Sequence, residues 1–486
     1  MKKYVLVIDE GTTSTRAIIF TDKMTPVASS QKRFTQFFPR NGWVEHDADE
    51  IYEKVLETIK EAMEKGDVSG KDIVSVGITN QRETIVPFDK NGKPVHRAIV
   101  WQCRRTTEMI NRLKETGIEE EVHRKTGLFL DPYFSGSKIR WLKENVKEAQ
   151  NALFGTIDAF LVFKLSGGRS FKTDPSNASR TLLFNINTMQ YDKDLMNTFK
   201  VDESALPSVR DSASIFGKIK NVPPLLDGTP ISGILGDQQA ALFGHGGIKK
   251  GLAKNTYGTG SFLLVNTGEK PEFFERGILT TVASEINGKT QYAIEGSVFI
   301  VGALIDWLKD VGLIKDVNEL NEILKNGTKT NIYFVPAFTG LGAPHWDPQA
   351  RGGMFGLTRD TRREDIVRGA VLSIPLQTEE LLRAVRKNGI EIKEMHVDGG
   401  VSNSDHIMQL QSDISNIKIM RPKLKEITAK GAALVSAVGA GLISLKDVEK
   451  FSEIDRVFTP HMTMEEREKM FKTYEKAVER VKKWEV

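Results

Sequence analysis

Arg82 and Glu83 are neighbouring residues of opposite charge that follow an apolar run over residues 73–78. The run is typical of a buried strand. The pair is therefore expected just past a strand's carboxyl end, where open α/β sheets bind ligands. An adjacent donor and acceptor can bind two neighbouring hydroxyl groups of one substrate. Taken alone, the pair is better explained as a surface ion pair, which contributes little to stability, and it is the rest of the chain that favours a substrate site.

A second carboxylate, Asp237, stands where an apolar strand over residues 230–236 meets a helix expected to begin at Gln238 or just after it. A carboxylate at such a junction either caps the helix or acts as a general base. The cap is the commoner role. The base is favoured here because hydroxyl-rich turns of the kind that bind phosphate occur elsewhere in the chain.

The first of these turns lies between apolar runs at residues 4–8 and 17–20, a pattern that predicts a β-hairpin. Gly11 allows a ligand to approach the backbone closely, and N–H groups with hydroxyls form a cradle for an anion. Asp9, at the end of the first strand, is expected to hold Mg²⁺ through water because hard cations prefer oxygen ligands. An ordinary turn rich in glycine and threonine is the alternative.

Residues 252–265 repeat this order of strand, Gly/Thr turn and strand. Two such units predict two similar domains that face one another across a nucleotide cleft. We place an N-terminal domain for substrate and phosphate at residues 1–247 and a C-terminal nucleotide domain at residues 248–486. The glycine-rich residues 246–251 are expected to form the hinge or linker between them.

Other strand ends and turns carry candidate pocket residues. Trp101 ends a short strand and either lines a pocket or fills core. Tyr133, in a turn ahead of a helix, either presents its hydroxyl to a polar ligand or packs its ring on the surface. Two glycines after Asp398 let a flat ligand approach the backbone at a helix N-terminus. A helix of small residues at 429–443 is expected to pack under that loop.

The composition describes a globular chain. A length of 486 residues exceeds one ordinary core, and 40% hydrophobic with 27% charged residues carries no signature of disorder. A net charge of +4, spread along the chain, argues against a nucleic-acid partner. The scattered histidines form no zinc-type cluster.

The sequence also predicts a cytoplasmic location. Its one cysteine, Cys103, excludes an internal disulfide and suits a reducing compartment. The chain enters a strand at Tyr4 without the pattern of a signal peptide. The longest run of small and apolar residues, 431–443, is too short to span a bilayer, so no stable membrane insertion is expected.

Taken in order, these motifs resemble those of the FGGY carbohydrate kinase family, and among its members those that phosphorylate glycerol. The resemblance covers essentially the whole chain. It implies an α/β fold with two ribonuclease H-like domains, of the actin, hexokinase and Hsp70 type, flanking a nucleotide cleft. The segments that carry it are residues 9–14, 37–47, 80–84, 133–145, 236–238, 255–262, 346–361 and 397–400.

The activity that the resemblance implies is MgATP-dependent phosphorylation of glycerol to sn-glycerol 3-phosphate, with Asp237 as the base. Phosphoryl transfer needs mainly alignment and charge neutralisation. A small triol offers little apolar surface, so its selection depends on buried hydroxyl partners. The matching glycerol residues are Arg82, Glu83, Tyr133, Asp237 and Gln238, with Trp101 and Phe262 against the carbon backbone. Those for ATP and its phosphates are Thr12, Thr13, Ser14, Arg16, Thr259, Gly302, Asp306, Gly400 and Ser404.

Several positions depart from the family pattern. Glu10 replaces the usual glutamine and is expected to add negative charge near the phosphates. Asp306 replaces a glutamine expected near the nucleotide base, and Ser404 stands where an asparagine is common. Residues 221–229 lack the loop that binds fructose 1,6-bisphosphate in some relatives, so that regulation is not carried over.

Two alternatives remain open. Another FGGY kinase, acting on a pentulose as xylulokinase does or on a longer polyol, would share the ATP machinery and differ at the strand tips. A non-catalytic ATP-dependent switch of the actin-like fold would need no acceptor for a proton, and Asp237 argues against it. The resemblance also implies ATP and ADP as partners and a homodimer or homotetramer as the assembly.

Overall fold

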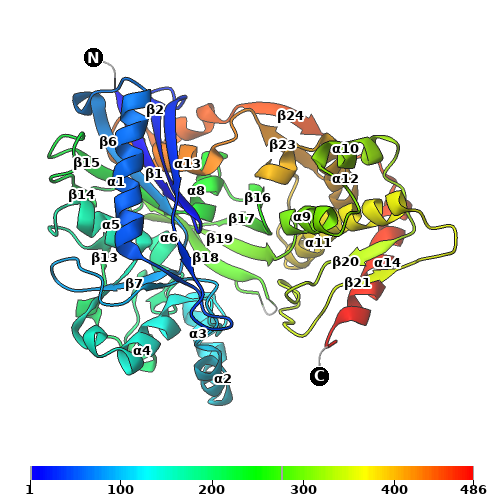
Figure 1. The fold of residues 1–486 in the computed structure, drawn as a ribbon, viewed down its shortest axis with the longest axis horizontal. Helices are drawn as coiled ribbons and strands as arrows, with labels where there is room; N and C mark the ends of the chain where they lie inside the picture. Colours follow the sequence, from blue (N-terminus) through cyan, green and yellow to red (C-terminus); the bar gives the residue numbers. More distant parts are fainter. Residues whose placement is uncertain (1–2, 275–276, 485–486) are drawn as a thin grey trace.

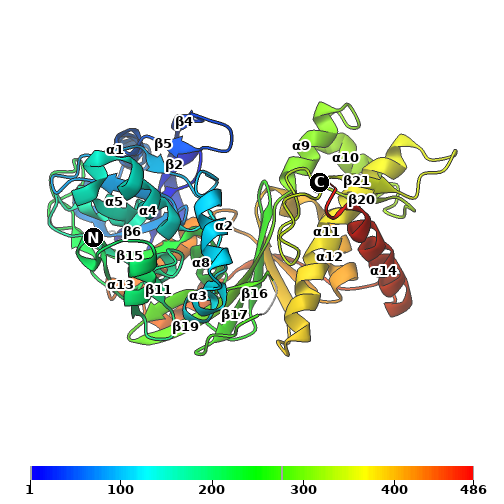
Figure 2. The same ribbon diagram turned by 90° about the horizontal axis from the view of Figure 1, so that it is seen from below.

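The computed structural model describes residues 3–274 and 277–484, and these form two lobes that are each built around a β-sheet. The N-terminal half forms one lobe in Figure 1, and most of the C-terminal half forms the other. Figure 2 shows β16, β17 and β19 between the two groups of helices. The predicted α/β architecture with two sheet-centred domains is confirmed.

The N-terminal lobe contains a six-stranded sheet whose middle strand, β1, is buried along its whole length. Its sequence is apolar on both faces because helices cover both sides of the sheet. The strands, in spatial order, are β14 (Gly217–Lys218), β15 (Pro230–Gly236), β6 (Ile73–Asn80), β1 (Tyr4–Glu10), β2 (Ser14–Thr21) and β3 (Pro26–Arg33).

One face of this sheet is covered by α1 (Ala48–Lys65), which begins after its N-cap, Asp47. The other face is covered by α13 (Ile427–Gly439), a helix from near the chain's end. Residues 429–443 were expected beneath the loop after Asp398; α13 instead packs on α8 (Asp237–Gly244), β15, β6 and β1. Its orange ribbon lies beside the blue strands in Figure 1.

Small residues allow this close packing of α13. A Cβ atom added at Gly233 would lie 2.3 Å from the backbone nitrogen of Ser436, and one at Gly77 would lie 2.6 Å from the carbonyl oxygen of Ala432. The hydroxyl of Ser232 donates to the carbonyl oxygen of Ser436 over 2.9 Å. The end of the chain therefore completes the core of the N-terminal lobe.

The C-terminal lobe contains a seven-stranded sheet. Its strands, in spatial order, are β18 (Leu279–Ile286), β19 (Lys289–Val298), β17 (Ser261–Gly268), β16 (Ala253–Tyr257), β22 (Glu394–Asp398), β23 (Lys418–Pro422) and β24 (Ile454–Phe458). The helices of this lobe are α9 (Gly302–Asp310), α10 (Val317–Lys325), α11 (Arg363–Lys387), α12 (Asp405–Ser415) and α14 (Met464–Val481).

The remaining elements are a smaller sheet, further helices, short strand pairs and 3₁₀ segments. A five-stranded sheet contains β4 (Gln36–Phe37), β5 (Glu45–His46), β8 (Ala98–Ile99), β7 (Ile85–Phe88) and β9 (Leu153–Thr156). Helices here are α2 (Thr107–Glu115), α3 (Glu119–Thr126), α4 (Ser135–Asn145), α5 (Ile157–Leu165), α6 (Pro175–Ala178) and α7 (Lys193–Thr198). Short pairs are β10 (Lys172–Thr173) with β13 (Ser208–Val209), β11 (Phe184–Asn185) with β12 (Gln190–Tyr191), and β20 (Tyr333–Val335) with β21 (Gly353–Phe355). The 3₁₀ segments are η1 (Gly70–Asp72), η2 (Lys147–Asn151), η3 (Glu203–Ala205), η4 (Gly400–Asn403) and η5 (Leu445–Phe451).

The two predicted Gly/Thr hairpins are confirmed, and they occupy matching places in the two sheets. β1 pairs antiparallel with β2 and parallel with β6. β16 likewise pairs antiparallel with β17 and parallel with β22. The boundary at residues 247 and 248 stays a prediction. Within the described residues, no helix combines the length and apolarity that a membrane crossing requires.

Candidate active site

Three strand ends meet at one edge of the N-terminal sheet. β6 runs parallel to both β1 and β15, so that Asn80 is level with Glu10 on one side and with Gly236 on the other. The residues that follow each strand therefore lie at the same carboxyl edge, as predicted for a ligand site in an α/β sheet. This register brings the turn after β1, the Arg82–Glu83 pair and Asp237 together.

Arg82 and Asp237 are in direct contact. The Nε atom of Arg82 lies 3.1 Å from Oδ1 of Asp237, and the arginine is almost fully buried. Gly236 makes room for this contact, because a Cβ atom there would lie 2.7 Å from Cδ of Arg82. The predicted substrate arginine and the predicted base thus share one site.

The Asp237 side chain is placed to accept a proton. It stands at the first position of α8, is 34% exposed, and receives a hydrogen bond of 2.7 Å from the backbone N–H of Gln238. Removal from water raises the pKa of Asp237 above its ordinary value, although Arg82 and Lys254 oppose that shift. A carboxylate with a raised pKa is a better base at neutral pH than an exposed one.

Aromatic residues form a wall beside this cluster. The rings of Trp101 and Tyr133 meet edge to face, with centroids 5.6 Å apart. Trp101 also donates from Nε1 to the hydroxyl of Thr12 over 3.0 Å, which joins the wall to the turn after β1. Phe262, the third predicted aromatic, lies in β17 of the other lobe. A pocket of this kind combines an apolar wall with a few fixed polar groups.

Arg180 and Glu295, two residues that sequence reasoning missed, link the polar side chains of the cluster. Arg180 donates from Nε to Glu83 over 2.6 Å and from Nη2 to Glu295 over 2.9 Å. Glu295 also accepts a hydrogen bond of 2.5 Å from Arg82. All four side chains are buried. Arg180 and Glu295 lie far apart in the sequence, in segments without a recognisable motif, so no local signal indicated them.

Lys254 is a further buried charge that the sequence analysis did not single out. Its ammonium group donates to Gln238, to the hydroxyl of Thr256 over 3.0 Å and to the backbone carbonyl of Phe262 over 3.3 Å. Burial lowers the pKa of Lys254 to about 8, against the pull of nearby carboxylates. The lysine in β16 therefore fixes two of the predicted substrate residues.

The turn between β1 and β2 is closed by a hydrogen bond of 2.9 Å from Gly11 N–H to the carbonyl of Ser14. Thr13 is exposed at its tip, and the Ser14 hydroxyl accepts a hydrogen bond from Gln31. Arg16 forms ion pairs with Asp9 and, over 2.6 Å, with Glu426. One oxygen of Asp9 is thus already engaged with an arginine.

A buried polar chain supports this turn from below. Gln36 donates to the carbonyl oxygen of Thr12 over 3.0 Å and contacts His46 at 2.7 Å, and Gln81 donates to Glu10 over 3.2 Å. Burial raises the pKa of Glu10 well above its ordinary value, against the hydrogen bond from Gln81. The expectation that Glu10 adds negative charge near the phosphates stays a prediction.

The second turn, between β16 and β17, is hydrogen-bonded to the N-terminus of α9. Gly302 N–H donates to the carbonyl oxygen of Gly258 over 3.0 Å, and Ala303 N–H donates to that of Thr259 over 3.1 Å. A Cβ atom at Gly302 would lie 2.5 Å from the Gly258 oxygen, so the contact requires glycine. Thr259 itself is exposed, as a residue that meets a phosphate must be.

The predicted nucleotide residues lie along the C-terminal lobe. Gly400 follows β22, is exposed, and has open space where a side chain would begin. Ser404 donates from its hydroxyl to Asn321 of α10 over 3.0 Å, which makes Asn321 a further candidate near the nucleotide base. The Asp306 side chain is 71% exposed and pairs with Lys309. Contact of these residues with a nucleotide stays a prediction.

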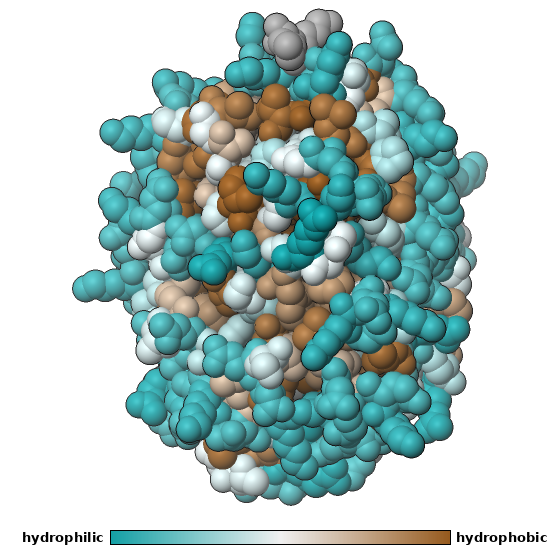
Figure 3. All heavy atoms as spheres, turned by 90° about the vertical axis from the view of Figure 1, so that its left-hand side faces the viewer, coloured by the Kyte–Doolittle hydropathy of each residue, from teal (hydrophilic) through white to brown (hydrophobic). Residues whose placement is uncertain are grey.

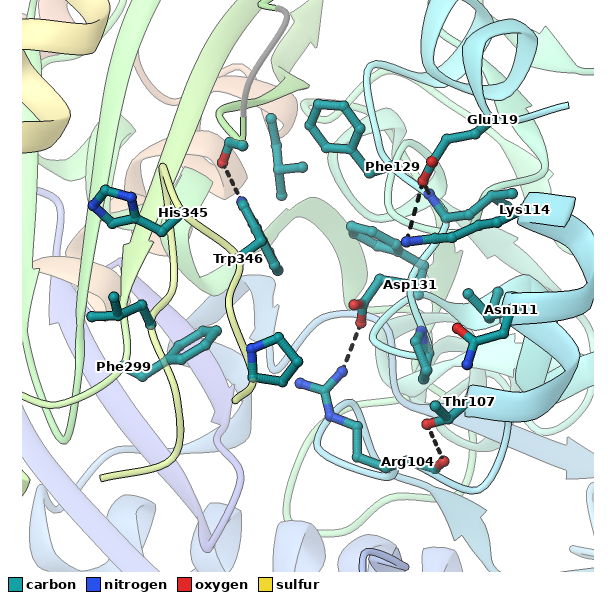
Figure 4. A pocket seen from close by; sticks show the side chains of 18 of the residues that line it. Arg104, Thr107, Asn111, Lys114, Glu119, Phe129, Asp131, Phe299, His345 and Trp346 are labelled. Atoms are coloured by element: carbon teal, nitrogen blue, oxygen red, sulfur yellow. Dashed lines mark hydrogen bonds and ion pairs between the residues drawn. The ribbon is translucent and has the colours of Figure 1, made fainter. Parts of the chain in front are cut away.

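A cavity of about 850 Å³ opens beside Tyr133, between α2 and α3 of the N-terminal half and the loop that contains Trp346. Figure 4 shows its charged side chains in pairs: Arg104 with Asp131 at 2.7 Å and Lys114 with Glu119 at 3.4 Å. The buried charged cluster around Arg82 does not line this cavity. We therefore place the candidate active site at the strand ends, where Arg82, Glu83 and Asp237 come together, and not in this cavity.

Comparison with known proteins gives the family. A model of the FGGY family of carbohydrate kinases, N-terminal domain, matches residues 4–244, and the model of its C-terminal domain matches residues 253–440. The chain belongs to the FGGY family of carbohydrate kinases. Both family models leave residues 245–252 between them, around the predicted linker.

Individual FGGY kinases match over nearly their whole length. Glycerol kinase of Shewanella pealeana is 46% identical over 492 residues, which is 99% of this chain and 100% of the relative. The crystal structure of Plasmodium falciparum glycerol kinase with ADP has a TM-score of 0.94 at 36% identity and covers 99% of this chain and 98% of that one. Gluconate kinase of Lactobacillus acidophilus, at 22% identity and a TM-score of 0.91 with coverage of 99% and 98%, shares the fold.

Proposed function

We propose that this FGGY kinase transfers the γ-phosphoryl group of ATP to glycerol, forming sn-glycerol 3-phosphate, with Asp237 as the general base. The observation that carries the proposal is the contact of Arg82 with Asp237. It lies at the edge of the sheet where β1 ends and the turn after β1 begins. The 46% identity to glycerol kinases over nearly the whole chain supports the choice of substrate.

Glycerol is a small triol, so it must be recognised through its hydroxyl groups. Arg82 offers guanidinium donors and Glu83 offers carboxylate acceptors at one strand tip. Trp101 and Tyr133 supply flat apolar surface for the carbon backbone. Gln238 is held by Lys254 and is ready to bond a third polar group.

Asp237 accepts the proton of the attacking hydroxyl in this proposal. Its carboxylate is partly exposed while Arg82 and the Gln238 N–H fix its orientation. In-line transfer between two aligned oxygens requires no covalent intermediate. The residues therefore need only orient the alcohol, accept its proton and keep water away.

The phosphates of ATP would lie between the two Gly/Thr turns. Hydroxyls and N–H groups of the turn after β1, together with Arg16, supply donors on one side, and Thr259 supplies them on the other. Gly302 and Gly400 would line the nucleotide. The donor set at the first turn, a carboxylate and three neighbouring hydroxyls, fits Mg²⁺ held through water by Asp9; once bound, the ion would neutralise phosphate charge.

The proposal extends to the assembly and the location of the protein. We keep the homodimer or homotetramer as a proposal; Figure 3 shows hydrophobic side chains gathered on the face that lies to the left in Figure 1, within a hydrophilic rim. Such patches are common at interfaces between chains. A cytoplasmic location is proposed because the single cysteine, Cys103, is buried and free. Light scattering of the purified protein would measure the assembly.

The decisive experiment is a substrate comparison. ADP release is measured with ATP and, in turn, glycerol, xylulose, ribulose and gluconate as acceptors. The proposal expects glycerol to have by far the highest kcat/KM. A preference for a ketose would replace glycerol with a pentulose as the substrate, and the absence of transfer to every acceptor would favour an ATP-dependent switch.

A further inference from the structure

We propose that Arg180 and Glu295 are positioning residues that hold Arg82 and Glu83 in place for two neighbouring hydroxyls of the polyol. This inference rests on the proposed function, because it assigns these residues a role in binding that substrate. Neither residue belongs to a motif of the sequence analysis. Both are completely buried, and Arg82 and Glu83, which follow the end of β6, are almost completely buried.

The four side chains form one chain of alternating charge. Glu83 accepts from Arg180 over 2.6 Å, Arg180 donates onward to Glu295 over 2.9 Å, and Glu295 accepts from Arg82 over 2.5 Å. The two oxygens of Glu295 are divided between the two arginines. Arg180 therefore bonds Glu83, Glu295 bonds Arg82, and Arg180 and Glu295 bond each other.

The central link needs a guanidinium group. Arg180 uses Nε for Glu83 and Nη2 for Glu295, two donors that lie in one plane and point in different directions. A lysine ammonium is a compact charge without this fixed fork, so it cannot reproduce both directed bonds. Arg180→Lys would therefore keep the positive charge but lose the two directed hydrogen bonds.

Glu83 has a backbone conformation that requires such support. Its φ angle is +64°, in the left-handed region that residues other than glycine rarely adopt. Strained backbone of this kind persists where the surroundings hold it, and it concentrates at functional sites. The bond from Arg180 acts on this residue directly. Without it, the Glu83 carboxylate would lose its defined direction.

Glu295 connects the polyol site to the other lobe. It lies in β19 and is paired with Leu264 of β17, the strand that also carries Phe262. Arg180 is docked to the same sheet, because the neighbouring Ser179 hydroxyl contacts that of Thr281 at 3.1 Å. The position of the substrate arginine is therefore set partly by the sheet of the C-terminal lobe.

The network also tunes the proposed base. Burial works against ionisation of Glu295, yet Arg180 and Arg82 outweigh it and lower the pKa of Glu295 to about 2. The titratable and charged groups that face Asp237 are Arg82, Lys254, Glu295 and Glu10. The negative charge of Glu295 partly offsets the positive charges of Arg82 and Lys254. Without it, these two cations would stabilise the ionised form of Asp237 more strongly and lower its pKa.

The test compares wild-type enzyme with Glu295→Gln at saturating ATP. We expect KM for glycerol to rise about 10- to 100-fold, because misplaced Arg82 and Glu83 lose charged hydrogen bonds to the hydroxyls. KM for ATP should stay unchanged. Discrimination against propane-1,2-diol, which lacks one hydroxyl, should fall about tenfold. The acid limb of the kcat/KM profile should move to lower pH.

The chain provides a matched control in Glu379, a second buried glutamate that accepts from two arginines. It bonds Arg383 at 2.8 Å and Arg386 at 3.0 Å within α11, away from the strand tips. Glu379→Gln should lower thermal stability without changing KM for glycerol, the preference over propane-1,2-diol or the pH profile. The Glu379→Gln variant therefore measures the general effect of neutralising a buried glutamate that is paired with arginines.

The inference is overturned if Glu295→Gln retains wild-type KM, substrate discrimination and pH profile, or changes only stability as Glu379→Gln does. If Glu295→Gln does not fold, Arg180→Lys makes the same test, since it keeps the buried charge and removes the directed fork. A wild-type enzyme that does not phosphorylate glycerol would instead refute the proposed function.

Discussion

Arg82 and Asp237 come from different strand ends of the N-terminal sheet, and their side chains meet at 3.1 Å. The base is thus oriented by the residue that is expected to bind the alcohol. The contact fixes the direction of the Asp237 carboxylate. Pre-organisation of this kind is a large part of how an enzyme lowers the barrier to phosphoryl transfer.

Asp237→Asn should abolish catalysis and leave nucleotide binding intact. The amide has nearly the same shape but cannot accept the hydroxyl proton, so kcat should fall about 10²- to 10⁴-fold. ATP affinity is measured by calorimetry on the same protein. Asp227→Asn, which removes an exposed carboxylate paired with Lys220, is the control and should behave as wild type. Unchanged turnover in Asp237→Asn would refute its role as base.

The pH profile should have two limbs with separate causes. Activity is lost as pH falls through the raised pKa of Asp237, because the protonated carboxyl cannot act as a base. Activity also declines as pH rises through about 8, where Lys254 loses the charge that faces Asp237, Asp398 and Glu295. Lys254→Arg keeps that charge and should move the alkaline limb to higher pH. An alkaline limb that does not move in this variant would assign it to another group.

Gly400→Val should weaken ATP binding without destabilising the fold. No atom lies within 4 Å of a Cβ added at Gly400, so the new side chain meets no protein atom near its base and extends into the space assigned to the nucleotide. KM for ATP should rise about tenfold or more, as expected when a bound ligand loses its close contact with the backbone. Gly400→Ala should show a smaller rise. Equal KM values in all three proteins would place the nucleotide elsewhere.

Gly233→Ala should destabilise the protein without a direct effect on the active site. The added methyl group would lie 2.3 Å from the backbone nitrogen of Ser436 in α13, and a packed backbone has little room to yield. Overpacking of this kind costs about 1–3 kcal/mol of the free energy of unfolding. Thermal denaturation measures the effect, and Gly400→Ala again provides the control. An unchanged melting temperature would mean that α13 packs more loosely than described.

The sequence predicted the parts of the site that depend on local patterns. Apolar runs bounded by glycine and threonine located both hairpins, and the strand over residues 73–78 placed Arg82 at a strand end. Asp237 was placed at its strand-to-helix junction for the same reason. Strand ends can be recognised locally because the alternation of apolar residues and turn residues is itself local.

The parts that the sequence did not predict depend on contacts between distant segments. Arg180 and Glu295 are single charged residues in unremarkable segments, and only the fold brings them against Glu83 and Arg82. Lys254 precedes the second turn but gave no sign of contact with Gln238. The complete burial of Glu10 is likewise a property of the folded state that its sequence neighbours did not indicate.

The packing of α13 has a consequence for synthesis of the chain. Strands β1, β6 and β15 are all made before residue 237, but the helix that covers one face of their sheet ends at Gly439. While the ribosome translates the second half, that apolar face has no native cover. The first lobe therefore reaches its native core only near the end of translation, and a fragment that stops at the linker would expose a surface prone to aggregation.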